Sequence, residues 1–227
     1  MAADAPLAER LAAVDAGIAD AARAAGRDPA ELTRIVVTKF HPASLVRELA
    51  ALGVRDVGEN RHQEAQAKAA ETAGLGLNWH FVGQLQSNKA RAVRRYARTI
   101  HSIDRDSLVD ALSGTGDAPV DGFLEIDLSG DPGRGGIAPE DAERLAERVL
   151  ASDGVRLVGV MGVAPLGAAP RAAFARLRAV SERVRRIAPD ARFISAGMSG
   201  DYPDAILEGA THLRIGTAIT GKRAGRG

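Results

Sequence analysis

Arg34-Ile35-Val36-Val37-Thr38-Lys39 is the most informative stretch of the chain, and Phe40-His41-Pro42 follows it directly. Residues 35–37 are apolar and β-branched without alternation, which is typical of a strand covered on both faces of a parallel sheet. Lys39 would then lie at the rim of a buried sheet. An amine held at an apolar strand end near another cation can lose its proton and condense with an aldehyde. The competing interpretation is a lysine that only extends from a strand end into solvent.

Short apolar runs alternate with helical patterns along the rest of the chain. The apolar runs predict strands at 35–38, 56–58, 79–83, 99–103, 123–128, 157–163, 193–196 and 213–216. The helical patterns lie at 43–52, 60–71, 87–96, 107–112, 139–151, 170–187 and 203–208, and an alanine-rich helix at 6–25 precedes them all. Eight strands, each followed by a helix except the last, predict one (β/α)8 TIM-type barrel with an extra N-terminal helix. An open doubly wound sheet shares this local pattern and is the alternative.

The composition excludes several classes of protein. The chain has 227 residues, 45% of them hydrophobic, which suits a single domain over 1–227, with a frayed tail at 221–227. A formal net charge of +1 and 4% aromatic residues argue against nucleic-acid binding. The arginines of 91–95 and 183–186 lie on amphipathic helical patterns, and we expect them to be solvated. The absence of cysteine, of a leader pattern and of a long apolar run predicts a cytoplasmic protein without disulfides or membrane spans.

Small and polar residues collect where the predicted strands end, which is the functional face of a barrel. The segments 195–200 and 216–217 follow the last two strands, where barrels often bind phosphate through backbone N–H groups. A phosphate opposite Lys39 indicates a phosphorylated carbonyl compound. Arg214 lies inside the last strand and needs an acceptor. That acceptor is either a pyridine nitrogen or carboxylate of a ligand, or a barrel carboxylate such as Glu59.

Simpler structural roles compete for the other polar residues. Ser199 and Thr217 suit turns and helix caps, and Asn60 suits an N-cap. His80 suits a hydrogen-bonded histidine of the core. The five histidines include no i,i+4 pair, so the helix of a zinc protease is absent and we expect no metal site.

Taken together, several motifs resemble the pyridoxal-phosphate homeostasis protein family (YggS/PROSC type), which is related to the N-terminal domain of alanine racemase. The motifs are Val37-Thr38-Lys39, Gly58-Glu59-Asn60, Trp79-His80-Phe81-Val82-Gly83, Leu85-Gln86-Ser87-Asn88-Lys89, His101-Ser102-Ile103-Asp104, Gly197-Met198-Ser199 and Arg214-Ile215-Gly216-Thr217-Ala218-Ile219. The resemblance spans the chain from residue 36 to residue 221. It implies a fold type III barrel that is a monomer.

The resemblance also implies a cofactor and its contacts. Pyridoxal 5′-phosphate would be held as an internal aldimine on Lys39. Its phosphate would lie against Ser199 and the backbone of Gly216 and Thr217, and its pyridine nitrogen would face Arg214. Asn60 and His80 would line the ring. Two features depart from the family pattern, namely Phe40-His41 after the lysine and a Gly-Arg-Gly-Gly loop at 133–136.

The implied function is binding of pyridoxal phosphate in vitamin B6 homeostasis, with delivery of the cofactor to apo-enzymes, and not catalysis. An arginine keeps its proton and leaves the pyridine nitrogen unprotonated, which weakens the cofactor as an electron sink. Racemases add a second acid or base, typically a tyrosine, whereas this chain has only Tyr96 and Tyr202. The alternatives are a pyridoxal-phosphate-dependent racemase or decarboxylase, and a Schiff-base aldolase without a cofactor.

Overall fold

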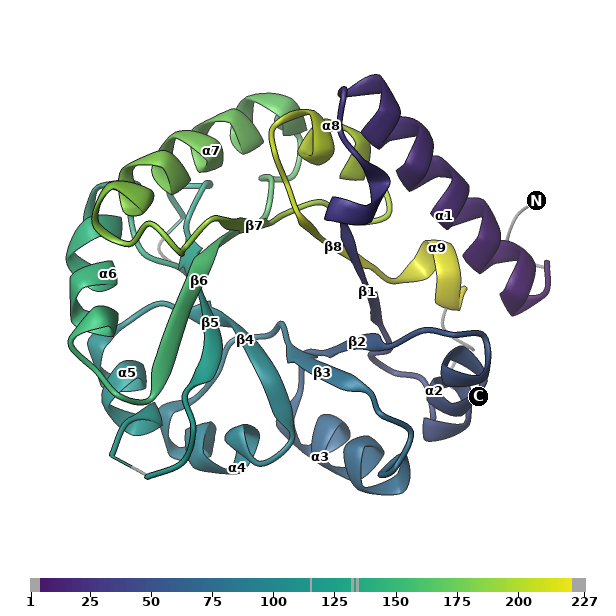
Figure 1. The fold of residues 1–227 in the computed structure, drawn as a ribbon, viewed down its shortest axis with the longest axis horizontal. Coiled ribbons are helices and arrows are strands. Elements are labelled where there is room, and N and C mark those ends of the chain that lie inside the picture. Colours follow the sequence, from purple (N-terminus) through teal and green to yellow (C-terminus); the bar gives the residue numbers. More distant parts are fainter. Residues whose placement is uncertain (1–4, 115, 132, 134, 222–227) are drawn as a thin grey trace.

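The computed structural model describes residues 5–114, 116–131, 133 and 135–221 as a closed barrel of eight parallel strands (Figure 1). Each strand pairs with its neighbours in chain order, and β8 pairs with β1 to close the barrel. The strands are β1 (Thr33–Val37), β2 (Asp56–Glu59), β3 (Asn78–Phe81), β4 (Ala97–Ile103), β5 (Val120–Ile126), β6 (Val155–Gly162), β7 (Phe193–Ser195) and β8 (His212–Ile215). The expected barrel is therefore confirmed, and the open doubly wound sheet is wrong.

A ring of helices surrounds the strands (Figure 1). The α-helices are α1 (Leu7–Ala24), α2 (Ala43–Ala51), α3 (His62–Glu71), α4 (Ala90–Arg94), α5 (Asp106–Leu112), α6 (Ala142–Leu150), α7 (Pro170–Ile187), α8 (Tyr202–Leu207) and α9 (Thr217–Thr220). Short 3-10 helices are η2 (Pro29–Glu31), η3 (Ser87–Lys89) and η4 (Pro139–Asp141). The expectation that no helix follows the last strand is wrong, because α9 begins directly after Gly216. Of the expected tail at 221–227, residues 222–227 lie outside the described part of the chain.

The N-terminal helix α1 closes the helical ring between α8 and α2, outside β8 and β1 (Figure 1). It contacts both α8 and α9. Its apolar stripe includes the buried residues Leu11, Val14 and Ile18. Arg10 Nε donates to the carbonyl oxygen of Ile219 in α9 at 2.7 Å. The extra N-terminal helix therefore supplies the cover that a helix after the eighth strand gives in a regular (β/α)8 barrel.

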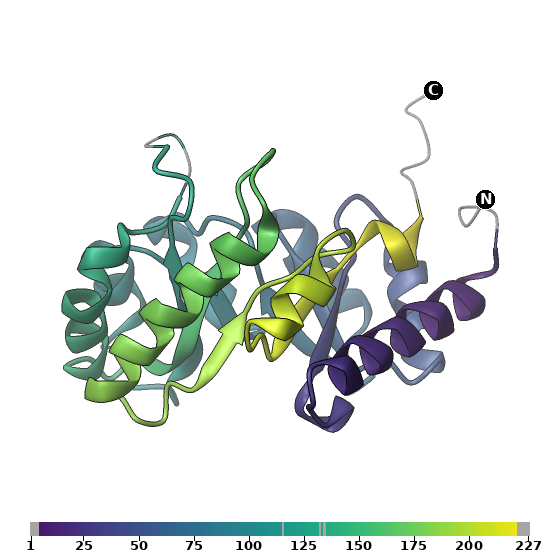
Figure 2. The ribbon, with the colours of Figure 1, turned by 90° about the horizontal axis from the view of Figure 1, so that it is seen from above.

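Figure 2 shows the barrel from the side, with α9 and the loop after β6 along one edge and η2, which precedes β1, along the other. Because all eight strands are parallel, the first edge collects their C-terminal ends. We call this edge the C-terminal face and the opposite edge the N-terminal face. The predicted site residues after β1, β2, β7 and β8 all belong to the C-terminal face.

β7 is a short strand between β6 and β8. β7 has three residues, and only one Cα pair, Ser195 with His212, joins it to β8. Gly159 of β6 lies opposite Phe193, and a Cβ atom at this glycine would overlap the Phe193 carbonyl oxygen. The missing side chain is therefore what allows these two strands to approach.

We predict that Gly159→Ala lowers the free energy of unfolding by about 2–3 kcal/mol, because added volume against rigid backbone cannot be relieved by a rotamer change. Denaturant unfolding measures the loss. Gly200→Ala is the matched control, since a Cβ there meets nothing within 4 Å and the φ angle is not positive. A Gly159→Ala protein as stable as this control would contradict the assignment.

Candidate functional site

Lys39 lies two residues beyond β1, in a tight turn on the C-terminal face. The turn is closed by the His41 N–H, which donates to the Thr38 carbonyl oxygen at 3.1 Å. Phe40 occupies the left-handed region with φ of 68°, the only non-glycine residue of the described chain to do so. Such a conformation is strained, and strain of this kind is common at binding sites. Lys39 itself is exposed. The expectation that its amine is desolvated at an apolar strand end is therefore wrong.

The turn is fixed from outside by helix α3. The Phe40 N–H donates to Glu64 Oε2 at 3.2 Å, and the Arg61 guanidinium lies 5.3 Å from the Phe40 ring centroid. Phe40, the first residue of the pair that departs from the family pattern, therefore contacts the start of α3 through both its N–H and its ring. The backbone that carries Lys39 is held in place while its side chain projects freely.

A buried ion pair supports the same turn from below. Lys68 of α3 donates to Glu59 Oε1 at 2.5 Å and to the Thr38 carbonyl oxygen at 2.9 Å, and the Thr38 hydroxyl donates to the same Glu59 oxygen at 2.7 Å. Lys68 supplies a second cation next to the Lys39 backbone, in an interior where its charge is balanced by a carboxylate. Glu59 is therefore occupied by Lys68, and the interpretation that it pairs with Arg214 is wrong.

The segments after β7 and β8 lie together on this face. The Arg214 N–H donates to the Gly197 carbonyl oxygen at 2.9 Å, and the Ala218 N–H donates to Ser199 Oγ at 3.3 Å. Gly197 has φ of 90°, and a Cβ there would lie 2.8 Å from the Ala205 Cβ, so both conformation and space require glycine. Thr217 is exposed, and it starts helix α9, whose first N–H groups have no partner within the helix.

These segments are also close to the strand that leads to Lys39. β8 pairs with β1, and a Cβ at Gly216 would lie 3.7 Å from the Val37 carbonyl oxygen. The structure therefore brings the lysine turn, Ser199 and the start of α9 to one sector of the C-terminal face. This is the arrangement that the sequence predicts for a phosphate bound opposite Lys39.

Arg214 is buried inside the barrel. Its Nη1 donates to Ser195 Oγ at 2.6 Å and its Nη2 to the Gly162 carbonyl oxygen at 3.1 Å. Burial lowers the pKa of Arg214 to about 10, although the charges of Glu125 and Asp201 oppose the shift. The guanidinium is therefore still protonated at neutral pH. It uses two of its five N–H groups in these contacts, which leaves donors for a ligand.

Glu125, near the end of β5, is a carboxyl group with a strongly raised pKa. Burial raises its pKa to about 7, the negative charge of Asp104 adds to the shift, and Arg214 opposes it. Its Oε2 atom is buried and makes no hydrogen bond. This carboxyl group can thus exchange a proton near neutral pH, a property that the sequence analysis missed because nothing local marks it.

His80 lies inside the barrel, and both of its ring nitrogens are occupied. Nδ1 lies 3.0 Å from His101 Nε2, and Nε2 lies 3.0 Å from Asp56 Oδ1. His101 Nδ1 in turn lies 2.9 Å from Ser195 Oγ. The structure therefore shows the hydrogen-bonded core histidine that the sequence analysis set against a ring-lining role.

Burial lowers the pKa of His101 well below its ordinary value, and the positive charge of Arg214 adds to the effect. Burial alone would raise the pKa of Asp56, but hydrogen bonds from His80 and Asn78 hold it below its ordinary value. Asp56, His101 and Ser195 were not among the predicted site residues. The available signal was a polar residue inside an apolar strand, which must find a partner within the barrel.

Asn60 does not cap helix α3, because the N-cap position belongs to Arg61 and carries no side-chain cap. Its Oδ1 atom is buried and lacks a hydrogen-bond partner. Buried polar atoms are nearly always paired, so an orphaned oxygen at the end of β2 is a position for a ligand donor. The N-cap interpretation is wrong, and a role in ligand contact stays a prediction.

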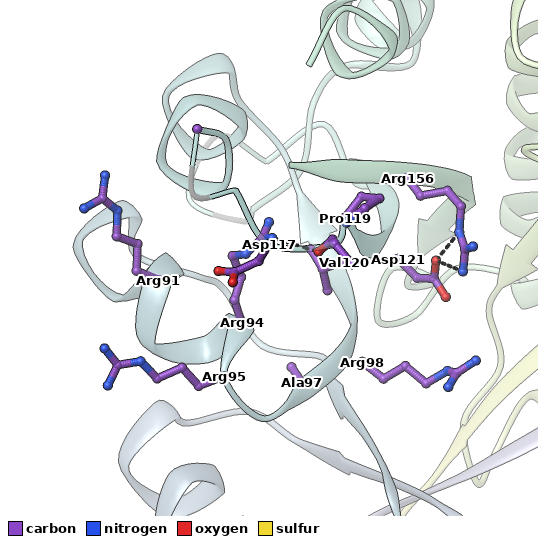
Figure 3. Close-up of a pocket in the computed structure, with 12 residues that line it drawn as sticks. Arg91, Arg94, Arg95, Ala97, Arg98, Asp117, Pro119, Val120, Asp121 and Arg156 are labelled. Carbon is purple, nitrogen blue, oxygen red and sulfur yellow. Dashed lines mark hydrogen bonds and ion pairs between the residues drawn. The ribbon is translucent and has the colours of Figure 1, made fainter. Parts of the chain in front are cut away.

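A large cavity lies elsewhere, on the N-terminal face between α4 and the starts of β4 and β5 (Figure 3). It has a volume of about 780 Å³. Arg91, Arg95 and Arg98 on its rim point in different directions and do not converge on a common point (Figure 3). Arg94 is not simply solvated as expected, because it donates to three backbone carbonyls at 2.6–2.9 Å. A large cavity without converging donors is not the site.

Among the described residues, no group of three or more histidine, aspartate or glutamate side chains could hold a metal ion. No helix in the same part of the chain has the length and apolar character needed to cross a membrane.

Comparison with known proteins identifies the fold and the family. The family "Alanine racemase, N-terminal domain" matches residues 10–224. A pyridoxal phosphate homeostasis protein of Pseudomonas aeruginosa is 45% identical over 96% of this chain and 96% of its own length. The protein of the same name from Mycobacterium leprae is 42% identical over 93% of this chain and 90% of its length.

Comparison with solved structures supports the same fold. PipY of Synechococcus elongatus, in a structure with pyridoxal phosphate bound, superposes with a TM-score of 0.82 at 36% identity, covering 95% of this chain and all of PipY. Alanine racemase of Corynebacterium glutamicum gives a TM-score of 0.70 at 16% identity, and this chain spans 63% of it, so that likeness concerns the fold alone. A barrel of the alanine racemase type with relatives of this similarity over nearly its whole length places the chain in the pyridoxal phosphate homeostasis protein family.

Proposed function

We propose that this chain binds pyridoxal 5′-phosphate reversibly on Lys39 and serves vitamin B6 homeostasis. The observation that carries the proposal is the joint placement of the lysine turn, the β7 and β8 segments and a buried, protonated arginine at one end of the barrel. The group fits: Asn60 offers a buried oxygen without a partner, and Arg214 has N–H groups to spare. The names of the relatives and the cofactor in the PipY structure support this ligand.

Lys39 is the residue that the proposal makes covalent. Its primary amine adds to the cofactor aldehyde and one water leaves, so that a carbon–nitrogen double bond replaces the carbon–oxygen double bond. Addition of water reverses the reaction and releases the cofactor. The exposure of Lys39 suits a site that exchanges its ligand with solvent or with another protein.

The phosphate contacts follow from the loop geometry. Ser199 Oγ and the backbone of Gly216 and Thr217 are the proposed partners of the phosphate, because small residues allow the anion to approach the peptide N–H groups. Arg214 is the proposed partner of the pyridine nitrogen. An arginine there donates a hydrogen bond and does not give up its proton, and the cofactor then supplies aldehyde chemistry with a weakened electron sink.

The two tyrosines favour binding over racemisation. A Cβ at Gly17 would overlap the Tyr202 hydroxyl, so this hydroxyl packs against α1 in the outer layer. The Tyr96 hydroxyl lies 3.3 Å from His62 Nδ1 at the start of α3. Both hydroxyls are thus engaged with the helical layer. We therefore propose a carrier that limits free aldehyde and delivers cofactor to apo-enzymes, acting as a cytoplasmic monomer without nucleic acid or metal.

One observation favours a second function. Glu125, with its pKa of about 7, is a carboxyl group able to act as an acid or a base near Arg214. A pyridoxal-phosphate-dependent racemase or decarboxylase needs such a group. Because arginine leaves the electron sink weak, we rank this activity below binding. The Schiff-base aldolase without a cofactor has no feature of its own in the structure to support it.

We predict that the purified protein with added pyridoxal phosphate shows an imine absorption band in the visible range, and that Lys39→Ala abolishes it. Lys89→Ala is the control, because Lys89 lies in η3, outside the proposed site. Absorption spectroscopy measures both proteins. A wild-type protein that stays colourless would favour the aldolase, and a band retained by Lys39→Ala would place the reacting amine elsewhere.

We predict that Ser199→Ala weakens pyridoxal phosphate binding about tenfold, the usual cost of one hydrogen bond to a charged group, and leaves binding of unphosphorylated pyridoxal unchanged. Thr217→Val is the control, since the proposed contact uses the Thr217 backbone. Fluorescence titration gives both affinities. Equal losses for the two ligands would mean that Ser199 acts on the ring or on the fold and not on the phosphate.

We predict that the loaded protein does not sustain exchange of amino-acid α-protons in deuterated water. Proton NMR of a panel of L- and D-amino acids measures the exchange. Sustained turnover that Glu125→Gln abolishes would establish the racemase or decarboxylase class instead. Glu147→Gln, on the exposed side of helix α6, is the control for a nonspecific effect of losing a carboxylate.

A further inference from the structure

A continuous chain of hydrogen bonds crosses the inside of the barrel. Five residues from five different strands form it, and each contact is 2.6–3.0 Å long. We call it the interior chain, and its members in order are Arg214, Ser195, His101, His80 and Asp56. The three inner residues are at most 4% exposed. Asp56 starts β2, so the interior chain ends on the N-terminal face, where the aspartate side chain is 26% exposed.

The chemistry of the two ends fixes the direction of the two outer hydrogen bonds. Arg214 has only donors, so it donates to Ser195. Asp56 is ionised and has only acceptors, so His80 Nε2 must carry a proton and donate to it. In the arrangement that the experiment below tests, His80 carries only this proton, so its Nδ1 accepts from His101 Nε2–H, and His101 Nδ1 accepts from the Ser195 hydroxyl. Each inner residue therefore accepts one hydrogen bond and donates one, always toward Asp56.

A neutral His101 is what its surroundings favour. Burial keeps the pKa of His101 well below its ordinary value, and burial lowers that of the neighbouring His212 to about 4. A further cation beside the buried Arg214 would be repelled. Two more charged groups, Glu125 and Asp201, act on the guanidinium electrostatically, but its hydrogen bonds go to Ser195 and to a backbone carbonyl.

We propose that Asp56 fixes the orientation of the Arg214 guanidinium through the interior chain, in which Ser195, His101 and His80 are uncharged, and that the guanidinium held in this way faces the cofactor ring. The statement about the cofactor rests on the proposed function, whereas the orientation of the interior chain does not. Asp56 touches no ligand in this account and is a positioning residue.

The orientation is tested directly on cofactor-free protein with ¹⁵N-labelled histidine. Long-range ¹H–¹⁵N correlation spectra report which ring nitrogen carries the proton. At neutral pH we expect His80 and His101 both to be protonated on Nε2 alone. A proton on His101 Nδ1, or a charged His101, would overturn the proposal without any substitution being needed.

Substitution at the far end provides the second test. Asp56→Ala removes the terminal acceptor, so we expect His101 to become a mixture of tautomers. Asp121→Ala is the matched control, because Asp121 also lies near the start of a strand on the N-terminal face but pairs with Arg156 outside the interior chain. A His101 spectrum unchanged in Asp56→Ala would overturn the proposal. Denaturant unfolding confirms that both variants are folded.

Cofactor affinity separates this proposal from the proposed function. We expect Asp56→Ala and Ser195→Ala each to weaken pyridoxal phosphate binding about five- to tenfold, the cost of disrupting one network contact, and Asp121→Ala to leave it unchanged. Wild-type affinity in Asp56→Ala would overturn the positioning role while the proposed function stands. A wild-type protein that binds no pyridoxal phosphate would overturn the proposed function, while the histidine tautomers would still decide whether the interior chain exists.

Discussion

A charged guanidinium enclosed by a barrel is the constraint on which the rest of the interior depends. An apolar core cannot solvate Arg214, so the fold must supply hydrogen-bond acceptors and a balancing negative charge. The strands carry the polar residues Ser195, His101 and His80 at inward positions. Hydrogen bonds join these residues to Arg214 at one end and to Asp56, at the opposite face, at the other. These hydrogen bonds leave the interior side chains few alternative arrangements. The Arg214 guanidinium is thereby held in one orientation by Ser195 and the Gly162 carbonyl oxygen.

A second feature of the structure is that the turn carrying Lys39 is held in place while the Lys39 side chain is exposed. The backbone around Lys39 is held by a buried Lys68–Glu59 pair below and by α3 at the side, while the Lys39 side chain is exposed. A buried catalytic amine would favour a single retained ligand. An exposed amine on a fixed turn, next to segments that suit a phosphate, fits reversible capture and release of an aldehyde.

The sequence was sufficient for the barrel and for the face on which the candidate site residues collect, because both depend on local patterns. Unbroken β-branched runs marked the strands, and the strand ends marked the C-terminal face. Strand limits moved by up to three residues, as at β5, which starts at Val120 although 123 was expected. Pairing with Val155 of β6 carries that strand further back than its apolar run suggests. Helix α9 escaped notice because four residues are too few to show helical periodicity.

The partners of the buried polar groups could not be read from the sequence, because they join strands far apart in the chain. Glu59 looked as suitable for Arg214 as any carboxylate, yet Lys68, nine residues away on the next helix, takes it. The central claim remains that Lys39 is the amine that holds pyridoxal phosphate. Borohydride reduction of the loaded protein followed by peptide mass spectrometry tests it most directly. The account predicts the reduced cofactor on Lys39, and its exclusive attachment to Lys68, Lys89 or Lys222 would contradict it.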